Sequence, residues 1–193
     1  MLRTGVFDSN PLLPMSDATT GYDLITDAIQ CIMDEPRRLY MPDWIVRGGR
    51  LRSLFVEAQR PSCGTACCLG GWITMLALGP SINEAMLNIS HTALNLTVGS
   101  EDIYTRRAAA GITWEEWREA RQALYHLFGD TTPDWIQDSD VPDEDGYRPG
   151  HYPEVGSVEY AEQYANKLRA FQQQHERVLR ATVVDRDARV MHV

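Results

Sequence analysis

Three of the chain's four cysteines lie in one short run, "PSCGTACCLGGWITMLALGP" (residues 61–80), together with four glycines and a tryptophan. Two kinds of chemistry use such residues. A thiol at a helix N-terminus has a lowered pKa and becomes a nucleophilic thiolate, which makes Cys63 a candidate nucleophile. Two thiols one helical turn apart can bind one metal ion, which makes Cys63 and Cys67 candidate zinc ligands, with histidines completing the set.

Packing is the third interpretation of this run, in which the cysteines serve as small buried hydrophobic residues. No charged residue occurs between Arg60 and Glu84, so a helix over residues 62–78 would be apolar on all sides and would lie at the centre of a domain. One side of it would carry only small residues and would let a neighbouring helix approach closely. That strip comprises Cys63, Ala66, Cys67, Gly70, Gly71 and Thr74.

The packing interpretation is favoured over both kinds of chemistry. No local signature places a histidine base beside Cys63, and no paired C-x2-C motifs are present. We therefore expect no catalytic residue, no metal and no cofactor. A cysteine-dependent enzyme or a zinc protein using Cys63 and Cys67 stays open as the alternative.

An arginine-rich segment precedes the cysteine run. Residues 37–60 contain six arginines and two acidic residues, with Tyr40, Trp44 and Phe55 interleaved. Arginine beside aromatic side chains suits phosphate-bearing or other anionic ligands. The structural alternative is a basic face that pairs with the protein's own acids. The predicted residues for binding a small anionic ligand are Arg37, Arg38, Tyr40, Trp44, Arg50 and Arg52.

Residues 130–156 are predicted to form an acidic surface loop, because they contain four prolines and three glycines. Asp143, Asp145 and Gly146 match part of a calcium-binding loop, but Val141 occupies the position of its first ligand. A solvated loop is the simplest interpretation. The other is an acidic arm that docks on a basic protein partner with Trp135 as its apolar anchor. The predicted partner-binding residues are Trp135, Asp138, Asp140 and Asp143.

Composition restricts the class of partner. The formal net charge of −9 argues against extended nucleic acid and against an anionic membrane surface, since both repel an acidic protein. No uncharged apolar run reaches the roughly 18 residues needed to span a bilayer, and no signal peptide is recognisable. Clustered cysteines are also unlike a secreted disulfide framework. We therefore expect a cytoplasmic protein with reduced thiols.

Helical periodicity and capping residues predict the elements that position these segments. Thr20 is a predicted N-cap for a helix that ends near Glu35, and capping boxes begin at Ser81 and Thr113. Ser157 begins a final long helix. Gly48-Gly49 permits a short hairpin within residues 37–60, and an irregular crossing with a helical piece is an equal alternative.

These elements predict a mainly α fold, a compact orthogonal helical domain of about five helices with a minor β hairpin. The expected organisation is a loose N-terminal segment (residues 1–19), a single helical domain (residues 20–181) that includes the acidic loop, and a C-terminal tail (residues 182–193).

The run "CGTACCLGGW" resembles a motif of small uncharacterised proteins of bacteria and their phages. The residues that carry the resemblance are Cys63, Gly64, Thr65, Cys67, Gly71 and Trp72. Flanking features extend it over residues 20–137, namely Pro36, Met41, Trp44, Leu127-Phe128 and Trp135. The group has no established activity, so the resemblance supplies no chemistry. Together with the other features it suggests a non-enzymatic binding protein of bacterial or phage origin, with a protein partner or a small anionic ligand.

Overall fold

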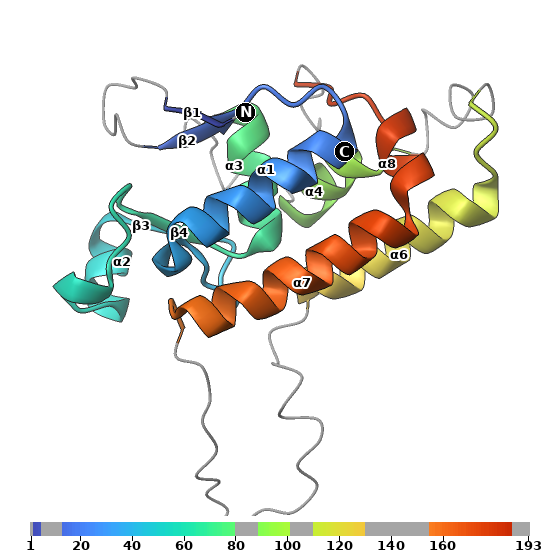
Figure 1. The fold of residues 1–193 in the computed structure, drawn as a ribbon. Helices are drawn as coiled ribbons and strands as arrows, with labels where there is room; N and C mark the ends of the chain where they lie inside the picture. Colours follow the sequence, from blue (N-terminus) through green and yellow to red (C-terminus); the bar gives the residue numbers. More distant parts are fainter. Residues whose placement is uncertain (1, 5–12, 80–88, 101–109, 130–154, 187–193) are drawn as a thin grey trace, which may run out of the picture.

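The computed structural model describes residues 2–4, 13–79, 89–100, 110–129 and 155–186, and in these residues the chain is mainly helical (Figure 1). The predicted mainly α architecture with a minor β element is confirmed. The α-helices are α1 (Gly21–Asp34), α2 (Gly48–Leu54), α3 (Leu69–Leu78), α4 (Ile89–Thr97), α6 (Trp114–Gly129), α7 (Val158–Gln174) and α8 (Glu176–Ala181). Among the described residues, the 3-10 turn η1 (Pro36–Arg38) follows α1 and the 3-10 turn η2 (Glu57–Gln59) follows α2.

Side-chain caps set the start of three helices, as the sequence predicted. Thr20 Oγ1 accepts a hydrogen bond from the Asp23 backbone N–H at 3.2 Å. The predicted box at Thr113 is complete, because its N–H donates to Glu116 Oε2 at 2.8 Å and its Oγ1 accepts from the Glu116 N–H at 3.1 Å. Ser157 Oγ accepts from the Tyr160 N–H at 3.2 Å. The predicted box at Ser81 lies outside the described residues.

Of the two alternatives predicted for residues 37–60, the structure has the crossing with a helical piece, and Gly48-Gly49 forms no hairpin. In the part of the chain that the structure describes, four strands form two antiparallel pairs, β1 (Leu2–Thr4) with β2 (Pro14–Ser16) and β3 (Ile45–Arg47) with β4 (Thr65–Cys67). The two glycines begin α2 instead, so β3 has its partner beyond both α2 and η2. Leu51 and Phe55 are four residues apart and pack in one buried cluster with Val46, which explains the helix.

The predicted helix over residues 62–78 is wrong in its first part. Residues 65–67 form β4, and the helix begins at Leu69 after an N-cap at Cys68. The competing structure is a backbone ladder, because the Tyr40 N–H donates to the Cys67 carbonyl at 2.9 Å and the Cys68 N–H donates to the Asp43 carbonyl at 3.0 Å. The predicted central position is confirmed, since every residue of α3 except Leu78 is buried.

The core is built around α1 and α3. Helix α1 packs against α3, α4, α7 and α8, while α3 packs against α4. Figure 1 shows α6 and α7 running side by side below α1, and the pair β3 and β4 with α2 at the opposite side from α8. Trp72 of α3 and Tyr164 of α7 are among the largest fully buried side chains.

The described parts of both terminal segments pack on the domain, so the prediction of a loose segment over residues 1–19 is wrong there. Leu13 and Ala18 are buried at 1% and 5% exposure, so the described part of the N-terminal segment packs on the domain. Residues 182–186 of the predicted tail dock on residues 16–21, where the Gly21 N–H donates to the Thr182 carbonyl at 2.9 Å and the Val184 N–H donates to the Thr19 carbonyl at 2.9 Å. The predicted final helix also breaks at His175, between α7 and α8.

Candidate functional site

The four thiols lie in the interior but not on one helix face. Cys31 belongs to α1, Cys63 precedes β4, and Cys68 caps α3. Cys63 Sγ donates to the Thr65 carbonyl at 3.3 Å, and Cys67 Sγ lies 3.6 Å from Met75 Sδ. All four are free thiols, with at most 2% of each residue exposed.

This arrangement removes the geometric basis both for Cys63 as a nucleophile and for Cys63 and Cys67 as zinc ligands. Cys63 is not at a helix N-terminus, and Cys63 and Cys67 are not one helical turn apart, because β4 replaces the predicted first turns. Within the described residues, no group of three histidine, cysteine or acidic side chains is arranged to hold a metal ion.

Burial also disfavours the thiolate form of every cysteine. Desolvation raises the pKa of the Cys31, Cys63 and Cys67 thiols above their ordinary value. It raises the pKa of Cys68 to about 12, although the Gly71 and Gly70 backbone N–H groups oppose the shift. The structure therefore keeps its thiols neutral, which is the opposite of what a nucleophile needs.

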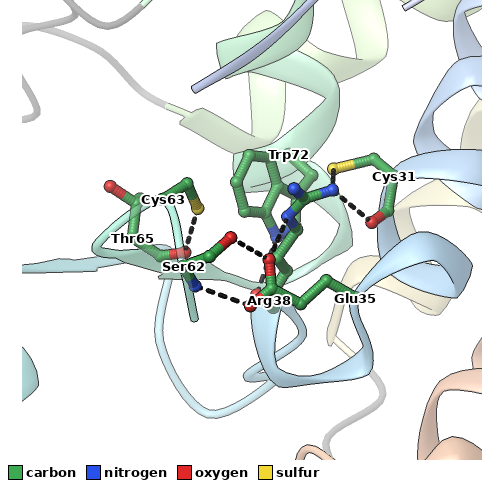
Figure 2. A network of polar contacts seen from close by, with 7 residues as sticks. All are labelled: Cys31, Glu35, Arg38, Ser62, Cys63, Thr65 and Trp72. Carbon is green, nitrogen blue, oxygen red and sulfur yellow. Dashed lines mark hydrogen bonds and ion pairs between the residues drawn. The ribbon is translucent and has the colours of Figure 1, made fainter. Parts of the chain in front are cut away.

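A polar network joins the thiol region to the arginine-rich segment (Figure 2). Arg38 Nη1 donates to the Cys31 carbonyl at 3.1 Å, and Arg38 Nε lies 3.2 Å from Glu35 Oε2. The Glu35 carboxylate in turn accepts from the Ser62 N–H at 2.6 Å and from Ser62 Oγ at 2.5 Å. Trp72 Nε1 donates to the Arg38 carbonyl at 2.8 Å. The network thus ties the end of α1 and η1 to the turn before β4 and to α3.

Replacement of Glu35 with alanine tests this network. We expect Glu35→Ala to lower the free energy of unfolding by about 2 kcal/mol, because hydrogen bonds to a charged group contribute about 1.5–3 kcal/mol and Arg38 would lose its ion-pair partner. Urea denaturation followed by circular dichroism measures the change. Glu57→Ala, at an exposed position of η2, is the control and should change stability by less than about 0.5 kcal/mol. Equal effects of the two substitutions would contradict the structural role of Glu35.

We name residues 45–67 the arginine lobe, because they form a unit with a small core of their own. Val46, Leu51, Phe55 and Ala66 make a buried cluster apart from the main core. Tyr40 packs on this cluster, and its ring meets that of Phe55 at 5.1 Å in an edge-to-face arrangement. The elements of the lobe, β3, α2 and β4, lie at one edge of the molecule (Figure 1).

The predicted anion-binding arginines engage separate partners of their own chain. Arg37 Nη1 donates to the Ala58 carbonyl at 2.8 Å, Arg50 pairs with Asp43, and the Arg38 guanidinium belongs to the network above. The side chain of Arg52 is exposed on α2. Among the predicted residues, Trp44 is 38% exposed while Tyr40 is packed on the small core of the lobe. Arg37, Arg38 and Arg50 thus each engage a different group of their own chain.

Sequence analysis missed the exposed apolar residues of the lobe. Leu54 is 46% exposed and Val56 is 64% exposed, on either side of the buried Phe55. Their signal in the sequence was the apolar triplet "LFV" within an otherwise polar segment, which periodicity alone does not resolve into buried and exposed members.

The predicted partner-binding residues Trp135, Asp138, Asp140 and Asp143 lie outside the described residues. The described chain on either side of them does reach the arginine-rich segment. Phe128, near the end of α6, borders Gly70 together with the Trp44 ring. Gly156, just before α7, lies against the Arg37 backbone and side chain.

No family model matches the chain, and comparisons with curated proteins and with solved structures find no match. Among the described helices, none is long and apolar enough to cross a membrane.

Proposed function

We propose that the chain is a non-enzymatic binding protein that engages an acidic segment of a protein partner through the arginine lobe. The observation that carries the proposal is the pair of exposed apolar side chains, Leu54 and Val56, beside the exposed Arg52 on a separately cored lobe. Apolar anchors surrounded by arginine are typical of protein interfaces, where arginine is enriched and lysine is depleted.

The arrangement of the arginines supports a protein partner over a small anionic ligand. A small anion is bound by side chains that converge, whereas Arg37 and Arg50 extend to different groups of their own chain. A protein surface can be met by cations that are spread out. Because the whole chain carries a net charge of −9, a local cationic surface would also orient an approaching acidic partner toward the lobe.

The setting of the protein is part of the proposal. Four free, buried thiols suit a reducing compartment, and we propose that the protein works in the cytoplasm. The motif around Cys63 and Trp72 supports a bacterial or phage origin, through its resemblance to small proteins of those sources.

Site-specific cross-linking in cells tests the proposal. A photoreactive residue at Val56 should capture one defined protein with an acidic segment. The same residue at Val183, which is 65% exposed and pairs with Thr20 at the start of α1, should not. Capture from both positions, or from neither, would contradict the proposal.

Affinity measurement with the captured partner then tests the chemistry. We expect Leu54→Ser combined with Val56→Ser to weaken binding at least about tenfold, and Arg52→Glu to weaken it more at low salt than at high salt. Val183→Ser is the matched control and should bind as the wild type does.

Native mass spectrometry distinguishes the other ligand class: a small anion that co-purifies with the wild type and is lost from Arg50→Ala would overturn the protein-partner proposal.

A further inference from the structure

The junction between α7 and α8 contains a buried histidine that the proposed function does not use. His175 separates the two helices with a φ of −115° and a ψ of 25°. Its ring packs on Phe171 at 4.9 Å, and the residue is 8% exposed. The Nε2 atom is buried and has no hydrogen-bond partner among the described residues. A proton added to this ring would therefore be placed in an apolar contact.

Charged groups surround the junction without pairing with Nε2. His175 is one of the residues that line a surface cavity of about 330 Å3, together with Glu116 and Glu119 of α6 and Glu176 and Arg177 of α8. Glu116 is engaged elsewhere, because it accepts from Arg177 at 2.6 Å and from the Thr113 N–H at 2.8 Å. Glu119 is the carboxylate that favours the charged ring, but burial outweighs it and lowers the pKa of His175 below the ordinary 6.5.

Helix α8 leads into the segment that docks on residues 16–21, at the start of α1. We name residues 182–186 the C-terminal clasp. Thr182 Oγ1 donates to the Val178 carbonyl of α8 at 2.8 Å, and the Thr182 carbonyl accepts from the Gly21 N–H at 2.9 Å. Arg186 Nη2 donates to the Ala18 carbonyl at 2.6 Å. The clasp therefore depends on the position of α8, and α8 follows directly from His175.

We propose that His175 is an acid-sensitive latch, whose protonation loosens α8 and releases the C-terminal clasp from residues 18–21. The neutral ring fits its apolar contact with Phe171, while the imidazolium needs an acceptor that the closed junction does not supply. The open form binds the proton more tightly than the closed form. Stability from this group is therefore complete above pH 6.5 and is lost as the pH falls below that value.

Amide hydrogen exchange, corrected for the intrinsic rate at each pH, measures the release. Between pH 7.5 and pH 5.0 we expect opening at the Gly21 and Val184 amides to increase by up to about thirtyfold, the limit for a group with an open-state pKa of 6.5. The Trp72 amide of α3, which donates to the Cys68 carbonyl, is the internal reference and should change much less. Equal increases at all three amides would show global unfolding and overturn the latch.

Two variants assign the effect to His175. His175→Phe keeps a ring against Phe171 and removes the proton, so its clasp amides should not respond to pH. His126→Gln, at an exposed histidine of α6, should respond as the wild type does. If His175→Phe does not fold, nuclear magnetic resonance titration of the wild type decides, because a His175 pKa at or above 6.5 would overturn the proposal. A response that persists in folded His175→Phe would also overturn it.

Discussion

Replacing Gly71 with alanine is expected to lower the free energy of unfolding by about 3 kcal/mol, the upper end of what overpacking typically costs. A Cβ at this position would overlap the Trp44 carbonyl oxygen and would lie 2.9 Å from Cys67 Cβ. Neither obstacle is the free end of a flexible side chain. The Trp44 carbonyl directly precedes β3, so relief would require the sheet of β3 and β4 to move away from α3.

Alanine substitutions at two other glycines, Gly70 in α3 and Gly49 in α2, serve as comparisons. Gly70→Ala would bring its Cβ to 3.0 Å from the edge of the Trp44 ring and 3.4 Å from Phe128, which are side chains that can shift, so a smaller loss is expected. Gly49→Ala in α2 meets nothing within 4 Å and should be neutral or stabilising by up to about 1 kcal/mol, because alanine favours a helix. Urea denaturation of the three variants measures the order. A loss for Gly71→Ala no larger than that for Gly70→Ala would contradict the close contact.

The same contact shows how far the sequence could predict the centre of the fold. The small residues of the cysteine run correctly indicated a close approach, and Gly71 is where it occurs. Its partner is the backbone at Trp44 and not a neighbouring helix. A run of small and apolar residues carries no period that separates three residues of strand from the helix that follows, so β4 was not recoverable from the pattern.

Capping residues predicted where three helices start. They could not predict structure that depends on contacts between residues far apart in the sequence. Thr20, Thr113 and Ser157 each cap a helix with their own side chain, and such a bond involves only neighbours in sequence. No glycine or proline lies near His175 to indicate that α7 ends there and α8 begins. The pairing of β3 with β4 likewise depends on residues about twenty positions apart, whose register is set by the shared core of the arginine lobe.

The sequence shows which residue types the arginine-rich segment contains, but it does not show which of their side chains are exposed. The density of arginine between residues 37 and 60 is visible in the sequence, and its role in binding stays a prediction. Which arginines turn inward depends on acceptors elsewhere in the chain, as Arg38 shows by donating to the Cys31 carbonyl. The exposure of Leu54 and Val56 likewise follows from Phe55 filling the small core between them.

Alkaline pH is expected to unfold the protein steeply, because the four buried thiols hold their protons in the native state. Burial raises the pKa of each thiol above its ordinary 9.0. Above that pH the unfolded chain binds fewer protons than the native chain, so stability falls as the pH rises. The slope approaches about 1.4 kcal/mol per pH unit for each thiol, or about 5 kcal/mol per unit for the four together. A domain of ordinary stability, about 5–15 kcal/mol, would unfold within one to three units above pH 9.

Cys68→Ser is the variant that separates this effect from other groups that titrate at alkaline pH. Serine preserves the acceptor that Cys68 Sγ offers to the Gly71 N–H at 3.3 Å, so stability at pH 7 should change by less than about 1 kcal/mol. Between pH 9 and pH 12 the variant should lose stability less steeply than the wild type, by about 1.4 kcal/mol per pH unit. Urea denaturation in the presence of a reductant, repeated from pH 7 to pH 10.5, gives both slopes. Identical slopes would show that Cys68 reaches solvent and ionises in the folded protein. Rapid labelling of the native thiols near neutral pH would show that all four cysteines are accessible to solvent.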